Sequence, residues 1–313
     1  MDFTGPVPTI WDSDSPVEAW HSSQEYLMRV KPPAIQIHSW SLHDVVDEIR
    51  RSIPGVRVVA GFGVDGIARR VAQNTWSVSR GVRQFVALAH AAWTAGAEVA
   101  VWNAEAGWKR PPTSEESKRL QEVIRSALLE IQVALPRLRQ WHTAYDHPHF
   151  HTSYPWKAWL GKDSPIELSL PQVYAAPEGG LVAHRGSLQA RETKALASWK
   201  EMVRRGQIRE DAPAGSEEDL KDCDWIPYYQ LHHNQVVDLC KQAVTYPFTC
   251  FWALRSRSDE DGRKALAALC ELHRRGYWRS EGIKDFQRDS GLTPDGSVGP
   301  MTLAALGVTA EPQ

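Results

Sequence analysis

Short apolar runs rich in β-branched residues alternate along the chain with longer amphipathic stretches. The apolar runs predict seven strands, at residues 34–40, 56–64, 97–103, 149–155, 166–175, 225–233 and 247–255. Apolar residues recur at the i, i+3, i+4 spacing of helices in segments 41–52, 82–96, 114–141 and 188–206. Strands that alternate with helical crossovers indicate an α/β fold with a parallel sheet.

The number of strands favours a (β/α)8 TIM-like barrel. Seven strands with helical crossovers in about 255 residues fit this closed architecture better than an open sheet, and we expect the eighth strand near the N-terminus. An open doubly wound sheet is the alternative. Its first strand is usually followed by a glycine-rich phosphate turn, whereas IHSWSLHD contains no glycine.

A polar stretch, RSRSDEDG at 255–262, predicts a domain boundary. Beyond it, RKALAALCELHRRG reads as a helix with a glycine stop, and the compact segment IKDFQRDSGLTPDGSVGPMTLAAL follows. In that segment Pro294 to Gly296 make a turn and Pro300 starts the last helix. We therefore expect a barrel domain at 1–258 and a small all-α module at 259–313.

The amino-acid composition limits the classes of binding partner that we expect for this protein. With 36 Lys and Arg against 38 Asp and Glu, the net charge of -2 provides no basic field for nucleic acid. No apolar run is long enough to span a membrane, and the N-terminus lacks the features of an export signal, so we expect synthesis in the cytoplasm. The four cysteines form no CxxC pair and are expected to be free thiols. The 14 tryptophans favour a carbohydrate ligand, because aromatic rings stack on sugars.

The strongest candidate site follows the strand at 97–103, in the sequence AEVAVWNAEAGW. Barrel enzymes carry their catalytic groups at the C-terminal ends of strands. Asn103 and Glu105 stand at i and i+2, so both side chains can face one pocket. Glu105 is therefore the candidate general acid, and the alternative is a solvated loop carboxylate.

Further candidates lie at other strand ends. Gln172 and Tyr174 have the same i, i+2 spacing and could hold an acetamido group or a developing charge, although Tyr174 could also be a core residue. Asp65 and Glu178 are candidates for a second carboxylate. If neither lies close, the N-acetyl group of the substrate could act as nucleophile. The candidate sugar-binding residues are Trp252, Trp108, Trp40, Gln230 and Asp65, with a core position as the alternative for Trp252.

A histidine-rich stretch suggests a metal-binding site as an alternative hypothesis. His142, His147, His149 and His151 precede or begin the strand expected at 149–155, which places them opposite the usual catalytic face. His232 and His233 are better placed, but adjacent strand residues point to opposite faces. The chain contains no G-x-S-x-G and no H-E-x-x-H motif, so the sequence supports neither a serine hydrolase nor a zincin. We expect no metal and no other cofactor.

The C-terminal segment resembles the small helical peptidoglycan-binding domain of many cell-wall hydrolases. The resemblance covers about 45 residues and rests on the spacing of FQ, GL, DG, VGP and T. One earlier stretch of the family pattern, DG-x-x-G-x-x-T, is absent. The matching residues are Leu269, Leu272, Gly276, Tyr277, Ile283, Phe286, Gln287, Gly291, Leu292, Asp295, Gly296, Val298, Gly299, Pro300, Thr302 and Leu306.

The rest of the chain is similar to the chitinase-type and muramidase-type barrel glycoside hydrolases. The resemblance is carried by N-A-E at 103–105, Q-V-Y at 172–174 and F-W-A at 251–253. It implies that Glu105 donates a proton and that Asn103, where these families usually have Asp, orients the substrate.

Together the two resemblances imply a peptidoglycan-degrading glycoside hydrolase of muramidase or N-acetylglucosaminidase type. The absence of an export signal suits a phage endolysin, which acts on the cell wall after release. The alternatives are a non-catalytic cell-wall-binding or virion protein with a degenerate barrel, and a metal-dependent amidase.

Overall fold

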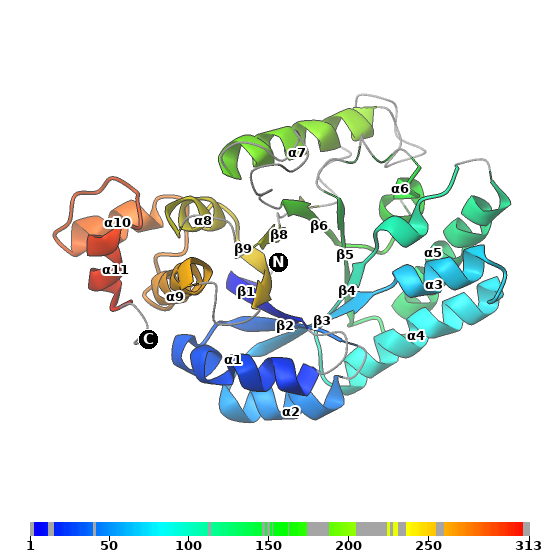
Figure 1. Cartoon of the computed structure of the whole chain (residues 1–313), viewed down its shortest axis with the longest axis horizontal. Helices are drawn as coiled ribbons and strands as arrows, with labels where there is room; N and C mark the ends of the chain where they lie inside the picture. Colours follow the sequence, from blue (N-terminus) through cyan, green and yellow to red (C-terminus); the bar gives the residue numbers. More distant parts are fainter. Residues whose placement is uncertain are drawn as a thin grey trace.

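The computed structural model describes residues 3–11, 16–39, 42–111, 114–145, 148, 151, 153–161, 163–173, 188–204, 224–225, 228–230, 236–254 and 260–308. Parallel strands form a barrel at the centre of the molecule, and helices surround it (Figure 1). The strands are β1 (Gly5–Trp11), β2 (Ala34–His38), β3 (Arg57–Gly63), β4 (Val99–Asn103), β5 (Arg139–Tyr145), β6 (Leu168–Val173), β7 (Asp224–Trp225), β8 (Tyr228–Gln230) and β9 (Phe248–Leu254).

Strand pairing closes the barrel. The strands β1 to β6 pair in sequence order, and each pair is parallel. Strand β6 pairs with both β7 and β8, β8 pairs with β9, and β9 returns to β1. The predicted (β/α)8 barrel is confirmed, and the strand expected near the N-terminus is β1.

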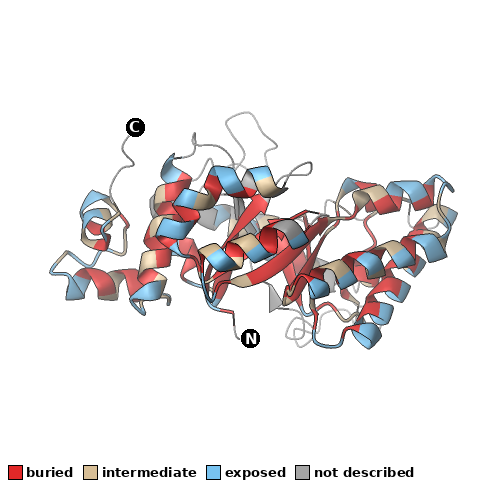
Figure 2. Cartoon of the chain, turned by 90° about the horizontal axis from the view of Figure 1, so that it is seen from below, coloured by how far each residue is buried: buried red, intermediate tan, exposed pale blue. Residues whose placement is uncertain are grey.

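Helices cover the outside of the barrel with their apolar faces turned inward, as the burial colouring of Figure 2 shows. Ser77 and Ser114 start two of them by accepting the amide hydrogens of Arg80 and Ser117. None of the helices in the described part of the chain is long and apolar enough to cross a membrane. The helices are α1 (Pro16–Val30), α2 (His43–Ser52), α3 (Asp65–Ala72), α4 (Val78–Thr94), α5 (Glu115–Ala134), α6 (Trp156–Leu160), α7 (Leu188–Arg204) and α8 (Val236–Ala243).

The barrel interior has an apolar core of its own. Alternate strand residues point inward, because successive side chains on a strand face opposite sides. The interior cluster contains Val7, Val59, Val101, Trp141, Leu168, Leu170, Phe248 and Cys250. As predicted, Cys240, Cys250 and Cys270 are free and buried thiols, whereas Cys223 lies outside the described residues.

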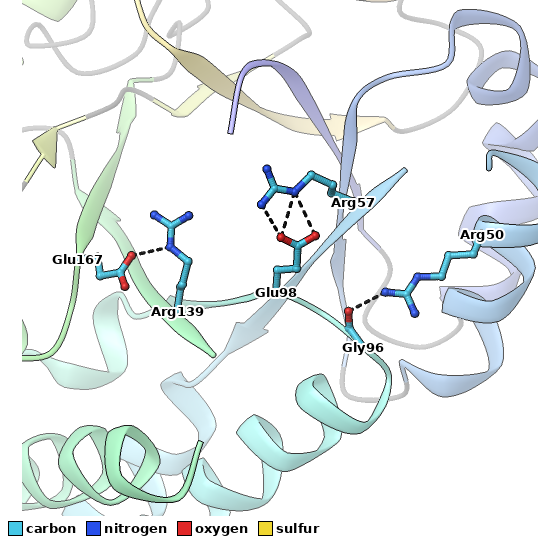
Figure 3. A network of polar contacts seen from close by, with 6 residues as sticks. All are labelled: Arg50, Arg57, Gly96, Glu98, Arg139 and Glu167. Carbon is cyan, nitrogen blue, oxygen red and sulfur yellow. Dashed lines mark hydrogen bonds and ion pairs between the residues drawn. The ribbon is translucent and has the colours of Figure 1, made fainter. Parts of the chain in front are cut away.

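The N-terminal end of the barrel is closed by Phe3. Its ring is 1% exposed, and the guanidinium of Arg57 lies 3.5 Å from the ring centroid. Arg57 donates to Glu98 at 3.0 Å, and Arg139 donates to Glu167 at 2.7 Å (Figure 3). A closed N-terminal end leaves the C-terminal ends of the strands as the place for a site.

Strand β5 corrects two sequence predictions. The helix predicted at 114–141 ends at Ala134, because Pro136 cannot continue a helix. The chain then enters β5 at Arg139, within the predicted helix. The described residues of the predicted strand 149–155, namely 151 and 153–155, are not in a strand.

The C-terminal module consists of α9 (Glu260–Arg274), α10 (Gly282–Asp289) and α11 (Pro300–Leu306), which starts at Pro300 as predicted. Helix α9 contacts β1 and α8, and the Tyr26 hydroxyl donates to the carbonyl of Arg263 at 2.7 Å. Helices α10 and α11 in turn pack on α9. Helix α9 thus packs against both the barrel and the other two helices of the module. The domain boundary predicted at 258/259 falls outside the described residues.

Gln287 organises the turn that the sequence motif predicts. Its side chain is buried and its Nε2 donates to Asp295 Oδ1 at 2.8 Å and to Thr302 Oγ1 at 3.1 Å. Its Oε1 accepts the amide hydrogen of Gly296 at 2.8 Å, and Gly296 has a φ of 76°. The FQ and DG motifs therefore build the fold of the module.

Candidate functional site

Three predicted side chains meet at the C-terminal end of the barrel. Gln172 of β6 donates from Nε2 to Asn103 Oδ1 and to Glu105 Oε1, each at 3.0 Å. Asn103 ends β4 and pairs with Thr143 of β5, while Gln172 pairs with Tyr145 of the same strand. The amide of Gln172 therefore spans β5 and joins the two residues that the i, i+2 spacing places together.

Asp65 holds the main chain at Glu105. It is the first residue of α3, and its Oδ1 accepts the amide hydrogen of Glu105 at 2.7 Å. Its Oδ2 accepts the amide hydrogen of Gly107 at 3.1 Å. A Cβ on Gly107 would lie 2.7 Å from the carbonyl oxygen of Asp65, so this approach requires glycine. The sequence predicted a sugar-binding residue or a second carboxylate, but both oxygens of Asp65 bind the loop that carries Glu105.

The residue between Asn103 and Glu105 is also fixed on both sides. The amide of Ala104 donates to the carbonyl of Thr143 at 3.1 Å, and the Tyr154 hydroxyl donates to the carbonyl of Ala104 at 3.1 Å. His142 Nε2 lies 2.8 Å from the same hydroxyl. Burial lowers the pKa of His142 to about 3, so the imidazole is neutral near pH 7. The Tyr154 hydrogen is used at Ala104, so Nε2 is the donor of the bond between the rings.

Lys109, Tyr145 and His151 border the site, and sequence reasoning missed the first two. Lys109 Nζ lies 4.0 Å from the ring centroid of Tyr145, and the ring of His151 lies 3.7 Å from it. Burial and, to a smaller extent, the charges of Glu105 and Asp65 raise the pKa of the Tyr145 phenol. The strand-end rule would indicate Tyr145, but the sequence predicts a helix up to residue 141 and no strand before residue 149.

A second missed group lies on β2. Gln36 and His38 share the inward face, and the ring of His38 lies beside Gly61 and Gly63 of β3, whose missing side chains leave room for it. Burial lowers the pKa of His38 to about 4. The amide of Gln36 is fully buried and makes no hydrogen bond with a residue of the described segments. The polar residues inside the apolar run AIQIHSW were the available signal.

Trp108 is a core residue and not a sugar platform. It is 1% exposed, and its ring packs against Phe85 at 5.9 Å and Trp159 at 5.4 Å between centroids. A sugar needs an exposed aromatic face, which this indole does not offer.

The remaining predicted site residues stay predictions. Tyr174, Glu178 and Trp40 lie outside the described residues. Gln230 and Trp252 belong to β8 and β9, but their side chains are not among those described.

The placement predicted for the histidine stretch is wrong, because β5 begins earlier than the expected strand. His142 lies within β5, and His151 contacts Tyr145 at the C-terminal end of that strand. His147, His149, His232 and His233 lie outside the described residues. Across the described segments, no cluster of three or more His, Cys, Asp or Glu side chains is placed to hold a metal ion.

Comparisons with known proteins match the two parts of the chain. Residues 280–306 match the family model "Putative peptidoglycan binding domain". The fold is similar to a GH18 chitinase from Pseudoalteromonas aurantia, with a TM-score of 0.53 and 9% identity over 86% of this chain and 99% of that one.

It is also similar to active domain 2 of the thermostable chitinase from Pyrococcus furiosus, with a TM-score of 0.50 and 14% identity over 80% of this chain and 84% of that one. No curated protein matches the chain in sequence. The chain thus combines a barrel of the GH18 chitinase fold with a C-terminal peptidoglycan-binding-like module.

Proposed function

We propose that this protein is a glycoside hydrolase that cleaves the glycan strands of bacterial peptidoglycan, with Glu105 as general acid. The observation that carries the proposal is the bridge from Gln172 to Asn103 and Glu105 at the C-terminal mouth of the barrel. In barrels of this kind the catalytic groups stand at that end.

The hydrogen-bond inventory of the bridge suits an N-acetyl sugar. Both hydrogens of the Gln172 amide are used, one on Asn103 and one on Glu105. The groups that remain are the Gln172 Oε1 acceptor and the Asn103 Nδ2 donor, neither of which binds a residue of the described segments. An acetamido group offers the complementary pair, an N–H donor and a C=O acceptor.

The same inventory favours a substrate-assisted reaction. Asn103 is neutral and is no nucleophile, and each oxygen of Asp65 accepts a main-chain amide hydrogen, which reduces the nucleophilicity of that carboxylate. The acetamido oxygen of the substrate would attack the anomeric carbon while Glu105 protonates the leaving oxygen. Water would then open the cyclic intermediate and lose its proton to the Glu105 carboxylate, which restores the acid.

The C-terminal module supports the cell wall as the polymer, because residues 280–306 match a peptidoglycan-binding family. We also propose the biological setting of a phage endolysin, which is made in the cytoplasm and acts on the wall after release. Tyr174, Gln230, Trp40 and Trp252 complete the proposed sugar-binding surface.

The test is lysis of isolated cell walls by the purified protein, with wild type compared with Glu105→Gln. We expect new reducing ends without new free amino groups, and a loss of about 10²- to 10⁴-fold in rate for the variant. Glu115→Gln is the matched control, because this side chain is 75% exposed on α5.

Each alternative has its own signature in this assay. Full activity of Glu105→Gln would refute the catalytic assignment. Loss of lysis on chelation, with new amino groups, would indicate a metal-dependent amidase. Wall binding without any cleavage would indicate a non-catalytic wall-binding or virion protein, which Asn103 in place of an acid favours.

A further inference from the structure

Lys109 places a cation at the rim of the candidate site. It follows the short helix η1 (Ala106–Trp108), and its amide donates to the carbonyl of Ala106 at 3.3 Å. The next amide, of Arg110, donates to the carbonyl of Ser153 at 3.1 Å. The backbone on both sides is thus fixed, and the ammonium is held 4.0 Å from the Tyr145 ring centroid, which is a cation–π contact.

The ammonium of Lys109 has no anionic partner within the described segments. It makes neither an ion pair nor a hydrogen bond there, although Glu105 and Asp65 are near enough to raise its pKa. Burial is the larger influence and lowers that pKa, so part of the hydration of the ammonium has been lost. The nearby carboxylates accept other hydrogen bonds, Asp65 from two main-chain amides and Glu105 from Gln172, and neither lies within ion-pair distance of the ammonium.

A partly dehydrated ammonium with unused donors is a binding group for an anion. The cation–π contact with Tyr145 uses the charge of the ammonium but leaves its N–H donors unused. Chitin has no carboxylate to offer such a group. Peptidoglycan has two kinds, the carboxylates of the stem peptide and, where no stem peptide is attached, the lactyl carboxylate of muramic acid.

We propose that Lys109 determines substrate specificity by binding a carboxylate of the peptidoglycan strand beside the scissile bond. This inference rests on the proposed glycosidase function. A charge-assisted hydrogen bond formed only with carboxylate-bearing glycans would favour them by about 10- to 100-fold in kcat/KM.

The competing explanation is that Lys109 only offsets the charges of Glu105 and Asp65. In that case its removal would change catalysis on every glycan by the same factor. The two explanations therefore differ in a ratio of rates and not in the rate on one substrate.

The experiment measures kcat/KM from reducing ends on three soluble substrates. The first is glycan strands freed of stem peptide, which expose the lactyl carboxylate. The second is the same strands after carbodiimide coupling to methylamine, which removes the charge. The third is peptide-bearing strands, in which the lactyl group is an amide and the stem carboxylates are free.

Lys109→Gln is compared with Lys109→Arg and with Lys118→Gln, which removes a charge at an α5 side chain that is 64% exposed. We expect Lys109→Gln to lower the ratio of kcat/KM on charged to amidated strands by about 10- to 100-fold. Lys109→Arg should restore most of the ratio, and Lys118→Gln should match wild type. A lower ratio on the peptide-free strands identifies the lactyl carboxylate as the bound group. A lower ratio on the peptide-bearing strands identifies a carboxylate of the stem peptide.

An unchanged ratio for Lys109→Gln on both charged substrates would overturn the specificity role, whether the absolute rates fall together or stay the same. If the wild type releases no reducing ends from any of the three substrates, the glycosidase function itself fails. These results are distinguishable, because the first requires an active wild type.

Discussion

Acidification tests the structure around His142, the neutral imidazole that supports the chain at Ala104. Its ordinary pKa is 6.5, and burial lowers this value to about 3 in the folded protein. Between these values the unfolded chain takes up a proton that the folded protein does not. The free energy of unfolding therefore falls as the pH drops below 6.5, and above 6.5 the histidine imposes no such loss.

The magnitude follows from the two pKa values. One unit of pKa difference corresponds to about 1.4 kcal/mol. At pH 5 the histidine is almost fully protonated in the unfolded chain and almost fully neutral in the folded protein. The relevant difference is therefore that between the unfolded pKa of 6.5 and pH 5, which is about 1.5 pH units. The contribution of His142 to the stability difference between pH 7.5 and pH 5 is therefore about 2 kcal/mol.

The assay is urea unfolding at pH 7.5 and pH 5, followed by tryptophan fluorescence, for wild type and His142→Gln. Glutamine keeps an amide donor for Tyr154 but does not titrate, so the stability difference between the two pH values should shrink by about 2 kcal/mol. His90→Gln is the surface control, since that side chain is exposed on α4. An undiminished pH difference in His142→Gln would refute the neutral, buried imidazole.

Three further substitutions probe the loop, the module and the core. Asp65→Asn should lower kcat on the glycan by about 10- to 100-fold with little change in KM, because the loop that carries Glu105 shifts. Steady-state kinetics measures both constants, and an unchanged kcat would contradict this prediction. Gln287→Met should lower the free energy of unfolding by about 1–3 kcal/mol, because the partly buried amide of Gly296 loses its acceptor. Calorimetry showing wild-type melting would contradict this. Trp108→Ala should cost about 3–5 kcal/mol in urea unfolding, whereas a sugar platform would change KM and leave stability intact.

The local pattern of apolar and polar residues was sufficient to predict most strands of the barrel. The runs that became β2, β3, β4 and β6 are dominated by apolar and β-branched residues, because both faces of these strands are buried. Strand β5, with the sequence RQWHTAY, carries Arg139, Gln140, His142 and Thr143, and its polarity disguised it. Two of these polar residues have partners in the folded protein. Arg139 binds Glu167 at the closed end of the barrel, and His142 bonds to the Tyr154 hydroxyl.

The site was predictable where it follows from strand ends and not where it depends on long-range contacts. The i, i+2 rule brought Asn103 and Glu105 together, and the same rule on a later strand supplied Gln172. The role of Asp65 depends on hydrogen bonds to amides about 40 residues away, which no local pattern reveals. The burial of Trp108 likewise depends on α4 and α6, and composition alone suggested a sugar ligand for it.

The buried position of Trp108 also explains how a lysine on a loop can be held accurately. With an exposed indole, η1 would be held only by its ends and by the hydrogen bond from Gly107 to Asp65, and the residue that follows would sample more positions. Instead the ring packs against Phe85 and Trp159, and Asp65 binds the amide of the preceding residue, Gly107. Core packing therefore fixes the backbone from which the Lys109 ammonium reaches Tyr145. Because a contact is worth its full energy only when it is preorganised, the specificity contact proposed for Lys109 depends on the packing of Trp108 in the core.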